Sequence, residues 1–136
     1  YSAKDLGRNT FQFYTQELTT NAFEYFAIEI ALRKALEHKQ FFLLYQPQYD
    51  LKSNRIIGVE ALIRWQHPDM GVVSPARFIP IAETSGQIEA IGQWVITESC
   101  RQCTAWRKQD LPYMTISINL SRKQLVVPAL ANDVRK

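Results

Sequence analysis

Residues 56–65 carry the clearest alternation of apolar and polar positions in the chain. Their short span and their β-branched side chains favour a strand over a helix. Successive side chains of a strand point to opposite faces. One face is then purely apolar and carries Ile57, Val59, Ala61 and Ile63. The other face is mixed and carries Gly58, Glu60, Leu62 and Arg64. Because a buried charge without a partner is costly, Glu60 needs either Arg64 as a structural partner or a metal, a cation or a ligand at a site.

A second strand is predicted at residues 41–49, separated from the first by residues 50–54 alone. A parallel crossover needs about a dozen or more residues, so the two strands must form an antiparallel hairpin. A turn centred on Lys52 and Ser53 sets Gln46 opposite Val59. Gln46 is therefore expected beside Glu60, within about one residue of register.

The amino-terminal third contains one predicted helix, at residues 23–38. Asn21 followed by Glu24 resembles a capping box at its start. A single apolar stripe follows the helical period, formed by Ile28, Leu32, Ala35 and Leu36. Before this helix, residues 10–14 alternate like a short strand.

Two more helices are predicted after residues 67–71, which read as a turn. Ser74 and Pro75 supply an N-cap and a first-turn proline for a short helix through Phe78. Pro80 is expected to restart or kink this helix, and Gly86 to end it. Residues 87–108 then predict a long amphipathic helix. Its expected core-facing residues are Ile88, Ile91, Val95, Cys103 and Trp106.

Residues 114–121 predict another strand, with apolar side chains at 116, 118 and 120 toward the helices and polar ones at 115, 117, 119 and 121 inward. Strands paired in parallel with helices between them make up part of a (β/α) barrel. Sites in such barrels lie at the carboxyl ends of the strands. Glu60, Arg64 and Asn119 are all expected there.

The composition suits one soluble globular domain, with 136 residues of which 46% are hydrophobic and 21% charged. Basic residues exceed acidic ones by only three, which is too mild to indicate a nucleic acid polymer as partner. No apolar stretch approaches the roughly 18 residues of a spanning helix. A cytoplasmic location is expected, with any membrane anchor upstream in the parent protein.

Three residues with reactive side chains are interpreted as structural. Cys100 and Cys103 form a C-x-x-C within a predicted helix, without the turn or the further ligands that a redox or zinc site needs. They are expected to be reduced thiols. His67 precedes a proline and has no predicted catalytic partner nearby.

Several motifs together resemble one family. Glu60-Ala61-Leu62 with Arg64-Trp65 resembles the signature of EAL domains, which hydrolyse the bacterial second messenger cyclic di-GMP. The resemblance runs from about residue 41 to about residue 125, and its other motifs follow the family's order: Tyr45-Gln46-Pro47, His67-Pro68, the run from Phe78 to Glu83, and the run from Ile118 to Ser121.

The resemblance implies the amino-terminal part of a (β/α)₈ TIM-like barrel with an antiparallel first strand, incomplete in this chain. Residues 1–9 resemble the end of a GGDEF domain, which often precedes EAL domains. The predicted division is therefore a GGDEF-like tail at 1–20, a linker helix at 21–39 and the first half of an EAL domain at 40–136.

Site roles follow from the same resemblance. Glu60 and Asn119 correspond to metal ligands for Mg²⁺ or Mn²⁺, and four residues correspond to substrate contacts: Gln46, Leu62, Arg64 and Pro80. The family's remaining metal carboxylates and its catalytic lysine come from the second half of the domain. No matching Asp-Asp-Phe-Gly segment occurs here, so no catalytic residue beyond the two metal ligands is predicted.

Three hypotheses about function remain open. The leading one is a parent cyclic di-GMP phosphodiesterase that produces linear pGpG, with this chain alone inactive. The second is a degenerate EAL domain that binds cyclic di-GMP as a non-catalytic receptor. The third concerns the isolated chain, whose open strand edges favour a homodimer, including one that exchanges the 23–38 helix. An upstream GGDEF or sensory domain is the expected neighbour in the parent protein.

Overall fold

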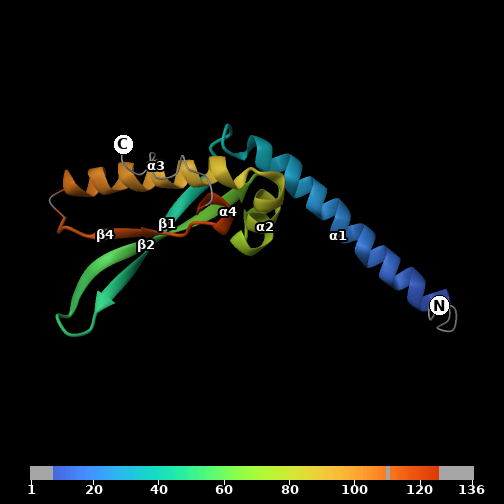
Figure 1. Ribbon diagram of the computed structural model, residues 1–136, viewed down its shortest axis with the longest axis horizontal. Helices are drawn as coiled ribbons and strands as arrows, with labels where there is room; N and C mark the ends of the chain where they lie inside the picture. Colours follow the sequence, from blue (N-terminus) through green and yellow to red (C-terminus); the bar gives the residue numbers. More distant parts are fainter. Residues whose placement is uncertain (1–7, 110, 126–136) are drawn as a thin grey trace.

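The computed structural model describes residues 8–109 and 111–125, which form one mixed sheet with helices beside it and at one of its ends (Figure 1). The strands are β1 (Phe41–Asp50), β2 (Arg55–His67), β3 (Gly71–Val73) and β4 (Thr115–Ile118). The helices are α1 (Arg8–Ala35), α2 (Pro75–Ser85), α3 (Ile88–Arg107) and α4 (Arg122–Leu125). Strand β2 is the centre of the sheet, because it pairs antiparallel with β1 and β3 and parallel with β4.

The β1–β2 hairpin confirms the prediction made from the short loop. The Asp50 carboxylate shapes the turn by accepting hydrogen bonds from the backbone amides of Lys52 (3.3 Å) and Ser53 (3.0 Å). Next to the turn, Tyr49 pairs with Ile56, as a turn centred on residues 52–53 requires. The register then shifts between Gln48 and Tyr49, so that Gln46 faces Glu60 rather than Val59.

This β-bulge also corrects the predicted environment of Ile57. The shift pairs Gln48 with Gly58 and Tyr49 with Ile56, which leaves Ile57 between them without a cross-strand partner. Ile57 is 55% exposed, whereas Val59 and Ala61 on the predicted apolar face are buried. The apolar face thus begins only after the bulge.

Gly58 permits the close approach of β4 to β2. A Cβ atom at this position would lie 2.5 Å from Thr115 Oγ1 and 3.0 Å from the Thr115 backbone oxygen. Since Gly58 pairs with Thr115 in the parallel register, a larger residue would push the two strands apart. The parallel pairing continues through Glu60 with Ser117 to Ala61 with Ile118, and so places the end of β4 beside the middle of β2.

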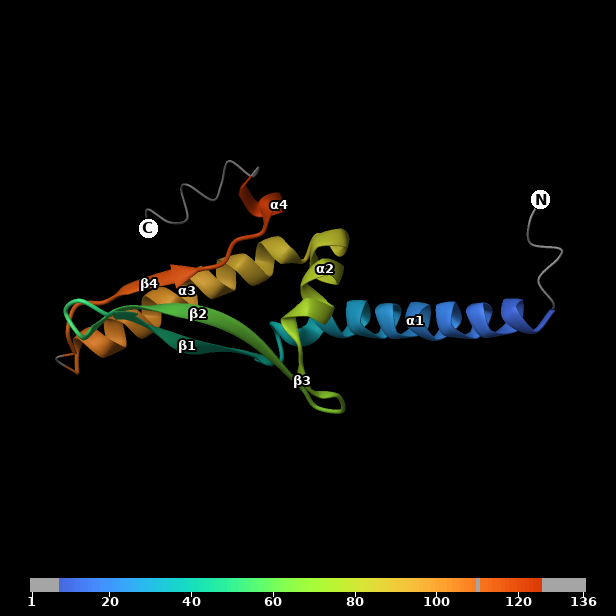
Figure 2. The same cartoon turned by 90° about the horizontal axis from the view of Figure 1, so that it is seen from below.

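Helix α1 starts earlier than the sequence indicates. It begins at Arg8, so the short strand predicted at residues 10–14 is wrong, and the capping box at Asn21 does not start a helix. The helix also ends at Ala35, before the predicted end at His38. Its amino-terminal part extends away from the sheet in both ribbon views (Figures 1 and 2). A continuous helix satisfies each backbone amide with a local partner, which a lone strand without a sheet cannot do.

The apolar stripe predicted for α1 joins the core at the carboxyl end of the helix. Ile28, Leu32 and Ala35 are buried, and Leu36 packs against them. Glu24 forms an ion pair with Arg77 of α2, which ties the two helices together at the surface. The GGDEF-like assignment of residues 1–20 stays a prediction, and its first seven residues lie outside the described part.

An aromatic cluster forms the centre of the core where α1, the hairpin and α2 meet. Phe41 and Trp65 are cross-strand partners with ring centroids 6.0 Å apart, and each lies against Phe78 of α2, at 5.8 and 5.6 Å. Trp65 and Phe78 are fully buried. The indole Nε1 of Trp65 donates to Gln40 Oε1 at 2.9 Å, so this polar group is satisfied within the core.

Helix α2 follows the predicted start and end, and Pro80 does not restart it. Ser74 is its N-cap, Pro75 opens it, and Gly86 ends it in the left-handed conformation at φ 79°. The helix continues through Pro80 to Ser85. Strand β3 was not predicted, because it has only three residues. It pairs with β2 across the turn after His67.

Helix α3 confirms the predicted long amphipathic helix. It covers the side of the hairpin away from Glu60, with Ile88, Ile91 and Val95 buried and with Cys103 and Trp106 half-buried. None of the helices in the described part is both long enough and apolar enough to span a lipid bilayer. The strand order, the parallel β2–β4 pair and the intervening helices confirm an incomplete (β/α) barrel with an antiparallel first strand.

Replacing Trp65 by alanine should lower the free energy of unfolding by about 3–5 kcal/mol, because a fully buried indole leaves a large cavity. Denaturant unfolding would measure the loss. Tyr113→Ala provides the control, since Tyr113 is 77% exposed and should change stability by about 0.5 kcal/mol or less. Equal losses in the two variants would contradict a core centred on Trp65.

The 136-residue chain should self-associate in solution. Among the described residues, β1 and β4 each have a strand neighbour on one side only, and Leu44 remains 48% exposed on the face of the hairpin that α3 does not cover. Open edges and exposed apolar faces recruit other chains. Light scattering should report a mass above that of a monomer, and Leu44→Glu should reduce it. Leu51→Glu in the hairpin turn is the matched control, and a monomeric parent chain would refute the expectation.

Candidate functional site

Three polar side chains meet on the face of the hairpin that α3 does not cover. Gln46 and Glu60 are direct cross-strand partners. Asn119 lies one residue beyond β4, and its Nδ2 donates to Glu60 Oε1 at 2.7 Å. The structure thus brings together three of the six residues assigned to the site from the sequence, at the carboxyl end of a parallel strand pair.

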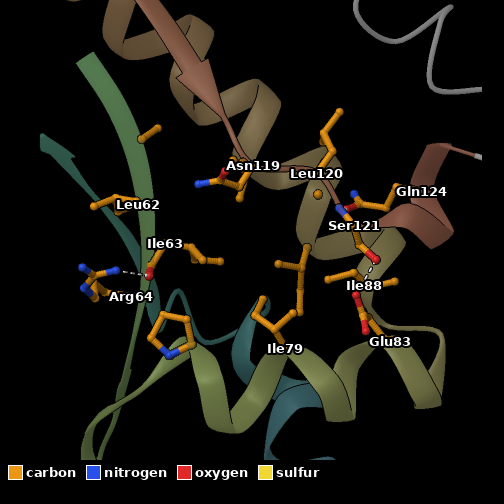
Figure 3. A pocket seen from close by; sticks show the side chains of 15 residues that line it. Leu62, Ile63, Arg64, Ile79, Glu83, Ile88, Asn119, Leu120, Ser121 and Gln124 are labelled. Atoms are coloured by element: carbon orange, nitrogen blue, oxygen red, sulfur yellow. Dashed lines mark hydrogen bonds between the residues drawn. The ribbon is translucent and has the colours of Figure 1, made fainter. Parts of the chain in front are cut away.

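Leu62 and Arg64 continue the same face of β2. Figure 3 shows both on one side of the strand, with Ile63 on the other side and pointing toward Ile79 and Ile88. The Arg64 guanidinium is half-buried and donates to the backbone oxygen of Ile63 at 2.8 Å. No ion pair joins Arg64 to Glu60 among the described residues, so the alternative of a structural pair is wrong.

A cavity of about 320 Å³ opens beside these residues. Strand β2 supplies its wall on one side, α2 and α3 supply its floor, and the segment that follows β4 supplies the opposite wall (Figure 3). The cavity lies on the side of β2 that faces α2 and α3, so Leu62 and Arg64 belong to its wall but point their side chains away from it (Figure 3). Asn119 also lines it, whereas Glu60 and Gln46 do not. The cavity is mainly apolar with a few polar groups at its edge, which is the usual character of a small-molecule site.

Pro75, rather than Pro80, lines this cavity. Pro80 is exposed on α2, and it is not one of the lining side chains. The lining residues of α2 are Pro75, Ile79 and Glu83, which recur every four positions along one face of the helix. This spacing is visible in the sequence and would have identified them. The predicted substrate contact at Pro80 stays untested.

The opposite wall of the cavity is held by side-chain hydrogen bonds. The Ser121 hydroxyl donates to Glu83 Oε1 at 2.5 Å, and the Ser121 backbone amide donates to Gln124 Oε1 at 2.8 Å (Figure 3). Lys123 Nζ donates to the backbone oxygen of Glu83 at 2.7 Å. The segment that carries Asn119 is therefore attached to the end of α2.

The donor atoms of Glu60 and Asn119 suit a hard divalent cation. A carboxylate and an amide carbonyl are the oxygen ligands that Mg²⁺ and Mn²⁺ prefer. The hydrogen bond between the two side chains shows that they are direct neighbours. Within residues 8–109 and 111–125, no cluster of three or more His, Cys, Asp or Glu side chains is placed to hold a metal, so the pair fits as part of a ligand set.

The helix-covered side of the hairpin carries one side chain with a shifted pKa, Tyr45. Burial raises the pKa of the Tyr45 hydroxyl, and the nearby Glu98 carboxylate raises it further. A hydrogen bond from Arg101 lowers the pKa of Glu98. The Tyr45 ring packs edge-on against Trp106 at 4.8 Å, which fixes Tyr45 on the helix-covered side and leaves its neighbour Gln46 on the site face.

His67, Cys100 and Cys103 take no part in this site. His67 Nδ1 accepts hydrogen bonds from the backbone amides of Asp69 (3.1 Å) and Met70 (3.2 Å), which confirms a structural role in the turn. The two cysteines are free thiols on α3, beside a second cavity between α3 and β4. They lie on the opposite side of the sheet from Glu60.

Comparisons with known proteins agree with this geometry. Residues 29–136 match the family model described as the EAL domain. The chain is 42% identical over 135 residues to the bifunctional diguanylate cyclase/cyclic di-GMP phosphodiesterase MucR of Pseudomonas aeruginosa, which covers 99% of the chain and 20% of MucR. It is 39% identical over 125 residues to the cyclic di-GMP phosphodiesterase PdeR of Escherichia coli, covering 92% of the chain and 19% of PdeR.

A solved structure of the PaMucR phosphodiesterase in complex with c-di-GMP superimposes with a TM-score of 0.77 at 41% identity. The superposition covers 80% of this chain and 44% of the other. The chain thus spans about a fifth of the length of the curated relatives it matches and less than half of the solved domain. The fold, the motifs and the family match together show that the chain belongs to the EAL domain family and forms part of one such domain.

Proposed function

We propose that this chain supplies the first part of the active site of a cyclic di-GMP phosphodiesterase that uses Mg²⁺ or Mn²⁺ to open the dinucleotide to linear pGpG. The observation that carries the proposal is the hydrogen bond between Asn119 and Glu60 at 2.7 Å. Glu60 is also the cross-strand partner of Gln46. The names of MucR and PdeR, which both include cyclic di-GMP phosphodiesterase, support the same reaction class.

Each side chain has a role that its chemistry supports. Glu60 and Asn119 would hold the metal through oxygen donors, with further ligands from outside the described residues. A bound divalent ion lowers the pKa of a ligated water and neutralises phosphoryl charge. Arg64, half-buried on the same face of β2 as Glu60, would grip a phosphate through its forked donors, while Leu62 and Gln46 would contact the rest of the nucleotide.

A non-catalytic receptor is the second candidate. The same residues would bind the dinucleotide in either case, because Arg64 and Gln46 contact the ligand without taking part in bond cleavage. Glu60 favours the enzyme, since a charged metal ligand retained in the site has no use in a receptor that needs no metal. The cytoplasmic location, the upstream GGDEF or sensory domain and the homodimer belong to the same proposal for the parent protein.

In the full-length protein, Glu60→Gln should reduce metal-dependent hydrolysis of cyclic di-GMP by about a hundredfold or more, because a metal's contribution to phosphoryl transfer is worth several kcal/mol. The glutamine keeps an acceptor for Asn119 Nδ2, so the fold should survive. Glu89→Gln, an exposed residue in the first turn of α3, is the matched control. Undiminished turnover by a folded Glu60→Gln protein would refute the proposal.

Arg64→Ala should raise the dissociation constant for cyclic di-GMP by about tenfold or more, since a charge-assisted hydrogen bond contributes about 1.5–3 kcal/mol. Calorimetry with Ca²⁺ in place of Mg²⁺ would measure binding without turnover. Arg107→Ala serves as control, because Arg107 stacks on Tyr113 at the far end of α3. Equal affinities of Arg64→Ala and the parent protein would contradict a phosphate contact.

A further inference from the structure

Asn119 projects from a short irregular link between two regular elements. Strand β4 ends at Ile118, whose pairing with Ala61 fixes the link at its first end. Helix α4 begins at Arg122 and has only four residues, so it provides a weak anchor by itself. The position of the Asn119 side chain therefore depends on whatever fixes the second end of the link.

Ser121 is that fixed point, because both of its donors are used. Its hydroxyl donates to Glu83 Oε1 on α2 at 2.5 Å, and its backbone amide donates to Gln124 Oε1 on α4 at 2.8 Å. We name Glu83, Ser121 and Gln124 the Ser121 clamp. The clamp joins the link to two helices by hydrogen bonds, one of them to a charged acceptor and hence stronger than a neutral pair.

Gln124 is held in the clamp by close packing. It is a polar residue only 5% exposed, so a broken hydrogen bond would leave its amide unsatisfied in the interior. Its amide lies directly over Gly92 of α3, where a Cβ atom would fall 1.6 Å from Nε2 and 2.8 Å from Cδ. Glycine at position 92 is thus a condition for the Gln124 conformation, and through it for the bond to Ser121.

We propose that the Ser121 clamp positions Asn119 for metal binding, with Glu83, Ser121 and Gln124 as positioning residues that touch neither the metal nor the substrate. The inference rests on the proposed role of Asn119 as a metal ligand. Only Leu120 separates Asn119 from the clamp, so a shift of Ser121 carries directly to the Asn119 amide. Groups that orient a metal ligand typically change metal affinity by about 10–100-fold when removed.

Calorimetric titration of the full-length protein with Mn²⁺, without nucleotide, tests the clamp. Ser121→Ala should raise the Mn²⁺ dissociation constant about tenfold, and Ser121→Thr, which keeps the hydroxyl, should restore most of the affinity. Thr84→Ala is the matched control, because Thr84 adjoins Glu83 but its hydroxyl donates only to the Pro80 backbone oxygen. Unchanged Mn²⁺ affinity in Ser121→Ala would overturn the proposal.

Two further variants separate positioning from general stability. In an Asn119→Ala background, Ser121→Ala should cause no further loss of Mn²⁺ affinity, because its effect passes through Asn119. Gly92→Ala should weaken Mn²⁺ binding by displacing Gln124, although alanine is the better helix former. Additive losses in the double variant, or full Mn²⁺ affinity in a folded Gly92→Ala protein, would show that the clamp is structural only.

The proposed phosphodiesterase activity can fail independently of the clamp. A parent protein that binds Mn²⁺ through Asn119 but leaves cyclic di-GMP intact would refute the hydrolytic function and leave the clamp testable by the same titrations. A parent protein that does not bind Mn²⁺ would overturn the clamp proposal as well as the metal-dependent mechanism.

Discussion

The cross-strand pair of Phe41 and Trp65 sets the register on which the rest of this structure depends. The two rings lie in the aromatic core with Phe78, and the same pairing, continued five residues along each strand, places Gln46 opposite Glu60. A slip of one residue would move every side chain of a strand to the other face. The apolar contacts that stabilise the core therefore also decide which polar side chains reach the site.

The β-bulge beside the turn reconciles two competing demands on the hairpin. The Asp50 turn favours a register in which Gln46 would face Val59, on the helix-covered side, whereas the aromatic core requires Gln46 to face Glu60. One unpaired residue, Ile57, absorbs the difference and is left 55% exposed. Bulges of this kind often lie next to functional sites, where they aim a side chain that regular pairing would misdirect.

The elements that could be predicted from the sequence are those with strong local signals. The short loop required an antiparallel hairpin, and the alternation in β2 put Glu60 and Arg64 on one face. The bulge depends on the pairing of distant residues, which local patterns do not encode, whereas the four-residue spacing of Pro75, Ile79 and Glu83 was present in the sequence and was missed. The sequence predicted that Glu60 and Asn119 lie near each other, because polar residues at the carboxyl ends of parallel strands meet at one edge. The structure adds the direct hydrogen bond between them.

The site is built from elements of different rigidity. Glu60 lies on a central strand with partners on both sides, and its backbone is fixed by β1 and β4. Asn119 projects from an irregular link whose second end is fixed by two side-chain hydrogen bonds of Ser121 and by one backbone bond, which the Gln124 amide donates to the Ser121 oxygen at 3.0 Å. A metal site needs both ligands held to a fraction of an ångström. Glu60 is held in place by the backbone pairing of its strand. The position of Asn119 depends instead on Ser121, on Glu83, and on Gly92, which leaves space for Gln124.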